Sequence, residues 1–459
     1  MEVQPLHVSF DQGSLLLKHV DERVVAMSPD LVFDDRVKAW RMPAFRYAEL
    51  IRELHEGGVP FIDDVAGKCL AKHAWTIQSD LQLRDYQAEA LDAWEAMNAQ
   101  GLIVLPTGVG KSIVGIAATV RKQVSTLVIV PTIDLMQQWS SVMERHLGEH
   151  IGMFGGGEKD LQPITVTTYD SANRMMEFWG DQFGLVIFDE AHHLPGPVNR
   201  LTAELACAPY RLALTATPER PDRGEEVIYR MVGPEVFRRE IDDFRQDTLA
   251  PYTLRRVYVD LTDREREAYE RARGVYREFL QRHGIDLAQP NGWQQFIQAC
   301  ARYPDGREAL EAYHQQKNIA LGAMAKMEEI WRILKRHRGE RILIFTAYNE
   351  LAYRIGEVFL LPVITHQTRA RERKTFLELF REGELSVLVT SRVLNEGIDV
   401  PEASVGIVVS GTGSVREYIQ RLGRILRPRH GKQAILYELI SGGTTEHYIA
   451  KRRRGKYAD

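Results

Sequence analysis

The feature that most constrains the fold is a series of short apolar runs that alternate with helix-prone stretches. Between residues 80 and 240 these runs are rich in β-forming residues, and each ends in Thr, Asp, Gly or Pro before a helical stretch follows. This alternation is typical of parallel strands joined by crossover helices, because such strands are buried on both faces. The same rhythm returns between residues 318 and 445. The sequence therefore predicts an α/β fold with two parallel-sheet lobes.

Three other segments depart from this rhythm. Residues 1–75 hold short alternating runs and one helix-prone stretch, which predicts a small N-terminal α+β domain. Residues 250–315 are charged and helix-prone, and a capping box from Thr262 to Glu265 opens the first helix. We expect a helical insertion there, between the two lobes. Residues 446–459 form a basic tail.

Length and composition set limits on class and location. A chain of 459 residues is long enough for about three compact domains. No apolar run approaches the roughly 20 residues that span a bilayer, and the N-terminus lacks a signal-peptide pattern. We therefore expect no membrane partner and a cytoplasmic location. The scattered Cys69, Cys207 and Cys300 predict buried free thiols.

A phosphate-binding loop follows the first strand of the first lobe. Its glycines let backbone N–H groups approach phosphates, while Lys111 supplies a charge to the β and γ oxygens and Ser112 offers a hydroxyl to Mg²⁺. The loop lies between a strand and a helix, as a phosphate cradle requires. Its predicted nucleotide-binding residues are Thr107, Gly108, Val109, Gly110, Lys111 and Ser112.

An acidic pair ends a later apolar strand of the same lobe. Asp189 can hold Mg²⁺, and Glu190 can orient and deprotonate the attacking water. The C-terminal end of a strand is where α/β folds place their ligand chemistry. His192 and His193 lack a partner cluster for a metal, so we interpret His192 as a contact across the lobe interface. The sequence thus predicts a site for ATP and Mg²⁺.

The second lobe contains a basic segment near its end. Arg424 and Arg427 are three residues apart, so on a helix they would share a face and could reach a γ-phosphate as arginine fingers. Gln420 precedes them in the same segment. We predict catalytic roles for these three residues together with Glu190.

With these motifs in this order, the chain resembles the superfamily 2 helicases from Leu83 to Pro428. The resemblance implies two RecA-like lobes. It also implies that Gln87, in a motif shared with Arg84, contacts adenine, and that Gly397 and Asp399 approach the nucleotide sugar. The residues that would couple the nucleotide site to the bound strand are His192, Thr215, Ala216 and Thr217. Those that would contact DNA are Thr132, Thr168, Arg220, Asp222, Thr346 and Thr390.

Within the superfamily the chain is most similar to the XPB family, in its compact archaeal form. The similarity lies in LRDYQAEAL, IVLPTGVGKS, FDEAHHLP, LNEGIDVP and SGTGSVREYIQRLGRILRP. It implies an ATP-dependent DNA helicase of DNA repair, moving 3′→5′ and binding single-stranded DNA and duplex junctions, with a nuclease or a larger repair complex as partner. By position, residues 1–75 would match a damage-recognition domain and residues 250–315 a helical thumb. The four-cysteine cluster of iron–sulfur helicases is absent from the sequence.

One departure from the family leaves alternatives open. The family has Arg-Glu-Asp after its TATPE motif, whereas this chain has Arg220, Pro221 and Asp222, so the loop lacks its central carboxylate. A double-stranded DNA translocase that does not separate strands is therefore an alternative. A DEAH-type RNA helicase and a regulatory ATP-binding module without turnover are the others.

Overall fold

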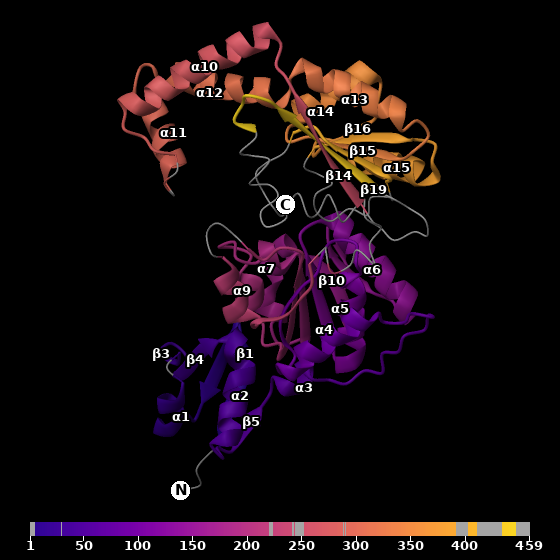
Figure 1. Cartoon of the computed structure of the whole chain (residues 1–459). Helices are drawn as coiled ribbons and strands as arrows, with labels where there is room; N and C mark the ends of the chain where they lie inside the picture. Colours follow the sequence, from indigo (N-terminus) through magenta and orange to yellow (C-terminus); the bar gives the residue numbers. More distant parts are fainter. Residues whose placement is uncertain are drawn as a thin grey trace. The chain divides into compact units, whose positions relative to one another are not determined.

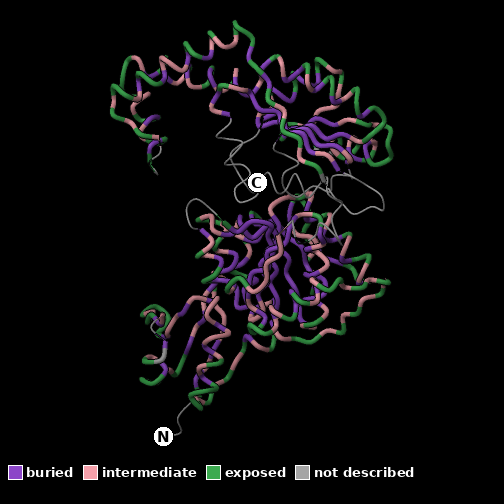
Figure 2. The backbone as a smooth tube through the Cα atoms, in the orientation of Figure 1, coloured by how far each residue is buried: buried purple, intermediate pink, exposed green. Residues whose placement is uncertain are grey.

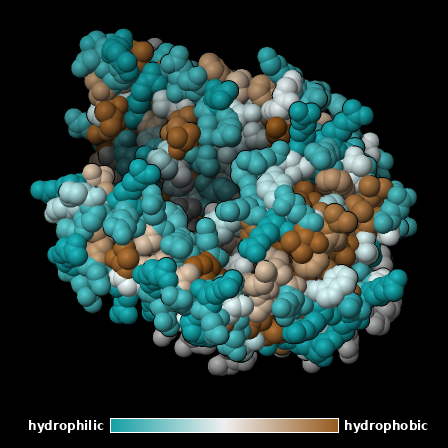
Figure 3. Space-filling model, turned by 90° about the horizontal axis from the view of Figure 1, so that it is seen from above, coloured by the Kyte–Doolittle hydropathy of each residue, from teal (hydrophilic) through white to brown (hydrophobic). Residues whose placement is uncertain are grey.

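The structure is a computed structural model that describes residues 5–28, 30–219, 224–240, 243, 252–287, 289, 291–391, 403–410 and 434–446. These residues fall into two compact units, one formed by residues up to 243 and the other by residues from 252 onward. Figure 1 shows the elements of each unit. Among the described residues, no helix is long and apolar enough to cross a membrane. In Figure 3 hydrophilic side chains cover most of the visible face, with separate hydrophobic groups between them.

The first unit begins with a small domain in which helices pack against a mixed sheet. Its strands lie in the order β3-β4-β2-β1-β5, and only β1 and β5 pair in parallel. Gln12 and Gly13 have positive φ angles of 46° and 81°, which fits the tight turn between β1 and β2. The strands are β1 (Leu6–Asp11), β2 (Ser14–Lys18), β3 (Val32–Asp34), β4 (Ala39–Pro43) and β5 (Phe61–Asp63). The helices are α1 (Glu22–Met27), the 3-10 turn η1 (Ala44–Arg46), α2 (Tyr47–Glu56) and α3 (Ala66–Cys69).

The rest of the first unit is lobe 1, an α/β lobe around a sheet of order β13-β6-β12-β11-β7-β10-β8-β9. All pairs in it are parallel except β8 with β9. Its strands are β6 (Gln100–Val104), β7 (Thr126–Val130), β8 (Gly152–Gly155), β9 (Glu158–Lys159), β10 (Ile164–Thr168), β11 (Leu185–Asp189), β12 (Tyr210–Thr215) and β13 (Glu235–Arg238). Its helices are α4 (Asp85–Ala96), α5 (Lys111–Lys122), α6 (Ile133–Leu147), α7 (Tyr169–Trp179), η2 (Ala191–His193), α8 (Leu201–Glu204) and α9 (Glu225–Met231).

The central strands of lobe 1 are buried along their whole length, as Figure 2 shows in purple. Helices cover both faces of such a sheet, which explains why β7 and β11 consist mainly of apolar residues. Because the strands are parallel, the segments after β6, β11 and β12 leave the same edge of the sheet. That edge carries the predicted nucleotide-binding residues.

The small domain packs directly on lobe 1. Lys68 Nζ lies 2.6 Å from Asp181 Oδ2. Cys207 of lobe 1 is part of the apolar core of the small domain. A Cβ added to Gly180 would lie 2.4 Å from the Phe10 ring, so the close approach requires glycine there. Polar, apolar and steric contacts therefore hold the two parts of the first unit together.

The second unit contains lobe 2, whose sheet has the order β14-β19-β18-β15-β17-β16 and is parallel throughout. Its strands are β14 (Tyr252–Val259), β15 (Ile342–Phe345), β16 (Val363–Ile364), β17 (Val387–Thr390), β18 (Val405–Val408) and β19 (Ala434–Ser441). Its helices are α13 (Met324–Arg336), α14 (Asn349–Phe359) and α15 (Ala370–Glu382). With lobe 1, this sheet confirms the predicted fold class of two parallel α/β lobes.

Between β14 and α13 lie the helices of an insertion with its own apolar core. These are α10 (Asp263–Arg282), α11 (Gly292–Arg302) and α12 (Gly306–Leu321). Tyr276, Phe279 and Phe296 are buried among them. Thr262 caps α10 as expected, and its hydroxyl accepts a hydrogen bond from Glu265 N at 3.3 Å. The stretch from 250 was expected to favour helix, yet residues 252–259 form β14, because their backbone pairs along its full length with β19.

Candidate nucleotide-binding site

The phosphate loop connects β6 to α5. Gly108 and Gly110 both have φ of +89°, a region that residues with a Cβ rarely adopt. A Cβ on Gly110 would also lie 2.7 Å from Gln87 Nε2. Helix α5 begins at Lys111, directly after the loop, so its free backbone N–H groups face this edge of the sheet. The loop therefore has the geometry of an anion cradle.

Lys111 supplies the positive charge of this cradle. Its side chain is 9% exposed, and Nζ lies 3.5 Å from Leu105 O and 3.7 Å from Glu190 Oε1. The Thr107 hydroxyl oxygen is buried, and no partner is found for it among the described residues. A buried polar atom without a partner costs free energy. A phosphate group at the cradle would supply acceptors for both side chains.

The acidic pair follows β11 at the same edge. Trp139 Nε1 of α6 donates a hydrogen bond of 2.7 Å to Asp189 Oδ2, and the Glu190 backbone N–H donates to Asp189 Oδ1 at 2.9 Å. Tyr169 OH donates to the Asp189 carbonyl oxygen at 3.3 Å. Glu190 adopts a left-handed conformation, with φ of 45°. The Asp189 carboxylate is thus held in one orientation by the Trp139 side chain of α6 and by the backbone N–H of the next residue, Glu190.

Burial dominates the electrostatics of this pair. It raises the pKa of Asp189 to about 6, and the Glu190 carboxylate adds to this shift, whereas Lys111 and the Trp139 hydrogen bond oppose it. Two buried carboxylates beside one ammonium group favour binding of a further cation. Within the described part of the chain, no cluster of three or more His, Cys, Asp or Glu side chains could hold a metal alone. This fits Mg²⁺, which usually takes one or two protein carboxylates and completes its shell with phosphates and water.

His192 links the acidic pair to the segment after β12. It is 1% exposed, and its Nδ1 lies 3.0 Å from Thr215 Oγ1 and 3.5 Å from Glu190 Oε2. Thr217 N in turn donates to Thr215 Oγ1 at 3.3 Å, and Ala216 between them is buried. These contacts all lie within lobe 1. A polar chain therefore runs from Glu190 to Thr217.

Gln87 joins the start of α4 to the phosphate loop. Its Oε1 accepts a hydrogen bond from Arg84 N at 3.0 Å, and its Nε2 donates to Val109 O and Gly110 O, both at 3.3 Å. Gln87 is 3% exposed, whereas Arg84 is exposed. The amide thus positions the loop.

The threonines predicted to contact DNA have internal roles. Thr132 and Thr168 are the N-caps of α6 and α7 and accept from Leu135 N and Ser171 N. In lobe 2, Thr346 and Thr390 are fully buried, and their hydroxyls donate to backbone carbonyls. Side-chain contacts of these last two with DNA would require them to become exposed.

Several predicted site residues lie outside the described part of the chain. They are Arg220, Asp222, Gly397, Asp399, Gln420, Arg424 and Arg427. The described residues that come together at one edge of lobe 1 are Gln87, Thr107 to Ser112, Asp189, Glu190, His192 and Thr215 to Thr217. Sequence reasoning missed Trp139, whose spacing from Met136 and Met143 is that of an ordinary buried helix face.

Three family profiles match the sequence. The Xeroderma pigmentosum group B helicase damage recognition domain matches residues 8–65, the type III restriction enzyme res subunit matches residues 80–220, and the helicase conserved C-terminal domain matches residues 325–429. The chain is 40% identical over 429 residues to a DNA 3′-5′ translocase XPB2 of Sulfurisphaera tokodaii, covering 94% of this chain and 97% of that protein. It is 35% identical over 464 residues to a DNA 3′-5′ helicase XPB of Mycobacterium tuberculosis, covering 97% and 76%.

A solved structure has a similar fold. The helicase domain of Pyrococcus furiosus Hef superposes with a TM-score of 0.58 at 20% identity, covering 83% of this chain and all of that one. At this identity the likeness supports the fold, with its parallel-sheet lobes, and carries no statement about substrate.

Proposed function

Because the chain belongs to the XPB family of superfamily 2 DNA helicases, we propose that it uses ATP and Mg²⁺ to drive 3′→5′ movement along DNA. The observation that carries this proposal is the buried cluster at the edge of lobe 1. There, Lys111 lies 3.7 Å from Glu190, and the adjacent Asp189 is fixed by a 2.7 Å bond from Trp139. The cluster has a cation for phosphate, a carboxylate for a metal and a second carboxylate for water.

Each of these side chains has a task in hydrolysis. Lys111 binds the β and γ oxygens, and the loop N–H groups orient the phosphate chain. Ser112 and Asp189 would hold Mg²⁺, which when bound neutralises charge that develops on the phosphates. Glu190 orients the attacking water and accepts its proton. Gln87 and Arg84 would lie on the adenine side.

Lobe 2 would complete the site from residues outside the described ranges. In this proposal Arg424 and Arg427 contact the γ-phosphate, Gln420 lies beside them, and Gly397 and Asp399 approach the sugar. These contacts exist only while the γ-phosphate is present. The arginines of lobe 2 would therefore bind the nucleotide before hydrolysis and release it afterwards, in each cycle. Such an alternation is what movement requires. Through His192 and Thr215–Thr217, hydrolysis would reach the segment that precedes Arg220 and Asp222.

The remaining domains would direct the motor. We propose damage recognition for residues 1–75 and ATP binding for residues 80–240. The thumb expected at residues 250–315 is narrowed to helices α10 to α12, because β14 belongs to the sheet of lobe 2, and the second lobe then consists of β14 with the chain from α13 onward. Contacts with the DNA strand should go mostly to phosphates, so affinity should fall steeply with salt. A nuclease or a larger repair complex would use the opened DNA. A motor of this kind works at the chromosome, which in a prokaryote is the nucleoid.

Two assays run side by side distinguish unwinding of a duplex from translocation along it. One specific feature favours translocation without unwinding, namely Pro221 where the family has a glutamate. The full chain is given a tailed duplex in one assay and a triplex in the other, with Lys111→Ala as the inactive control. We expect ATP-dependent release of a strand from the 3′-tailed duplex. Triplex displacement without unwinding would assign the translocase instead.

The choice of nucleic acid is tested on the same protein. ATP hydrolysis is measured with single-stranded DNA, duplex DNA and RNA in parallel. We expect DNA to stimulate turnover more than RNA does. Preferential stimulation by RNA would assign a DEAH-type RNA helicase, and no stimulation by any of them would assign a regulatory ATP-binding module.

A further inference from the structure

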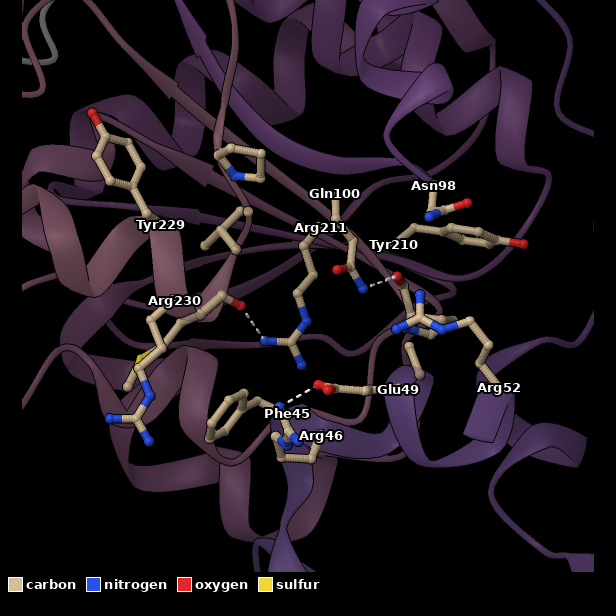
Figure 4. Close-up of a pocket in the computed structure, with 16 residues that line it drawn as sticks. Phe45, Arg46, Glu49, Arg52, Asn98, Gln100, Tyr210, Arg211, Tyr229 and Arg230 are labelled. Carbon is tan, nitrogen blue, oxygen red and sulfur yellow. Dashed lines mark hydrogen bonds and ion pairs between the residues drawn. The ribbon is translucent and has the colours of Figure 1, made fainter. Parts of the chain in front are cut away.

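A cavity lies where the small N-terminal domain meets lobe 1, and its volume is about 420 Å³ (Figure 4). One wall is the turn η1 with the first half of α2. The other walls are the starts of β6 and β12 and the segment 229–234 that leads from α9 to β13. The phosphate loop follows the opposite end of β6. This cavity is therefore separate from the nucleotide-binding edge of the sheet.

Its lining is strongly basic. Four arginines line it, namely Arg46, Arg52, Arg211 and Arg230. Glu49 is the one carboxylate among the described lining residues, and it forms an ion pair with Arg46. Arg46 is also 3.2 Å from Asp30, so two carboxylates compensate this arginine. The other three arginines leave the cavity with a net positive charge.

Arg211 is the most unusual of these groups. It is 2% exposed, and its guanidinium donates only to backbone carbonyl oxygens in the hydrogen bonds found among the described residues. Those acceptors are Ala203, Ala206, Ala208 and Met231. Burial lowers the pKa of Arg211 to about 10, so it remains charged at neutral pH. Its donors are thus occupied by the backbone, so Arg211 adds a positive charge beside the cavity, and the hydrogen bonds to a ligand would have to come from Arg52 and Arg230.

The exposed arginines lie on facing walls. Arg52 extends from α2 and Arg230 from α9, and Arg230 lies 5.8 Å from the centre of the Phe45 ring, across the junction between the domains. In Figure 4, Arg230 and Arg52 lie on opposite sides of Arg211. A guanidinium group can donate two parallel hydrogen bonds to the oxygens of one phosphate. Several arginines together therefore favour a ligand with more than one negative charge.

We propose that this cavity binds a small polyanion that carries two or more linked phosphates. The volume lies within the range of small-molecule sites, which is roughly 300–1,000 Å³. Such a phosphate chain is present both in free nucleotides and in inorganic polyphosphate. A DNA backbone fits less well, because it needs an open track of cations, whereas these arginines line a cavity between two domains. The proposal does not depend on the motor activity.

The test uses the full chain with Lys111→Ala, which weakens phosphate binding at the ATP site. Inorganic triphosphate is titrated by calorimetry. We expect one binding event, which Arg52→Gln or Arg230→Gln weakens by about tenfold or more, since each removes a charged hydrogen-bond donor. Both side chains are exposed, so the fold should persist, and thermal melting checks this. Arg23→Gln is the matched control, because Arg23 is an 84% exposed arginine of the same domain outside the cavity.

The outcomes separate the possible ligands. Competition by ATP in the Lys111→Ala background would identify the triphosphate of a free nucleotide as the ligand, and lack of competition would identify inorganic polyphosphate. The proposal is overturned if triphosphate gives no binding, or if Arg52→Gln and Arg23→Gln behave alike. It is also overturned if Arg52→Gln weakens only the binding of short duplex DNA. These titrations measure binding and not turnover, so they test the cavity even if DNA does not stimulate ATP hydrolysis by the wild-type chain.

Discussion

Trp139 makes a contact that no other described side chain makes, because its indole N–H binds the carboxylate we propose for Mg²⁺. The hydrogen bond to Asp189 Oδ2 is 2.7 Å long and buried. The ring also packs on α5, where a Cβ at Gly115 would lie 2.6 Å from it. Trp139 thus connects α6 to both the phosphate-loop helix and the acidic pair. Groups that orient a metal ligand in this way affect metal affinity.

Trp139→Phe should separate this role from packing. Phenylalanine keeps an aromatic ring beside Gly115 but leaves Asp189 Oδ2 without its donor. We expect DNA-stimulated turnover to fall about tenfold or more, and the Mg²⁺ concentration for half-maximal rate to rise. Trp331→Phe is the control, since Trp331 is 49% exposed on α13. An unchanged Mg²⁺ dependence would show that Trp139 only fills space.

Gly110 and Gly383 provide a matched pair for the phosphate loop. Both have φ of +89°, but a Cβ at Gly110 would meet Gln87 at 2.7 Å, whereas one at Gly383 has nothing within 4 Å. Either alanine substitution should cost about 1 kcal/mol of folding free energy through backbone strain. Only Gly110→Ala should also weaken ATP binding, as measured by titration. Equal ATP affinity in the two variants would contradict the proposed role of the loop.

Much of the site could be predicted at this scale because its residues sit in short, continuous motifs. Lys111 and Glu190 are far apart in the chain, yet both follow strands of one parallel sheet, which brings them to 3.7 Å. The burial of Thr346 and Thr390 could not be predicted, since it depends on which neighbours cover them. Trp139 was missed because it lies on the buried apolar face of α6, where its spacing predicts only packing and not a hydrogen bond to Asp189.

At the scale of elements, helix signals within a short stretch of sequence predicted the structure well. Pairing between strands distant in the sequence could not be predicted. The capping box at Thr262 and Glu265 is present, and the apolar residues of α10 from Tyr269 to Leu280 pack against the other helices of the insertion and its base. Strand β14 was missed, although its Tyr, Thr and Val residues are types that favour strands. It forms by pairing with β19, and the partner residues Tyr252 and Ala434 are distant in sequence.

A buried ion pair ties α13 to the chain after β19. Lys326 and Glu446 are both fully buried, 2.7 Å apart, and Lys326 also donates to Val409 O at the end of β18. Lys326→Met would leave Glu446 buried without its cation, and we expect a loss of about 3–5 kcal/mol in urea unfolding of the second unit.

Two further variants complete this test. The double variant Lys326→Met/Glu446→Gln should recover part of the loss, because no unpaired charge remains. Arg307→Gln breaks an exposed pair with Glu311 on α12 and should leave the unfolding midpoint unchanged. If the single Lys326 variant unfolds at the wild-type midpoint, the pair does not hold these elements together.

At the scale of the whole molecule, the alternation of strands and helices was enough to predict two parallel lobes, because it reflects burial on both faces of each sheet. The junction cavity could not be predicted. Its arginines come from η1, α2, β12 and α9, and only the packing of the small domain on lobe 1 brings them together. Sequence patterns report on neighbours along one element, whereas such a cavity depends on contacts between domains.

The claim that this site drives a DNA motor is tested most directly by DNA-stimulated ATP hydrolysis in Glu190→Gln. The amide keeps the size of the side chain but cannot accept the proton of the attacking water, so turnover should fall about 100-fold or more while ATP still binds. Glu204→Gln, on α8 of the same lobe, should keep the wild-type rate. Turnover of Glu190→Gln within a few-fold of wild type would contradict the account.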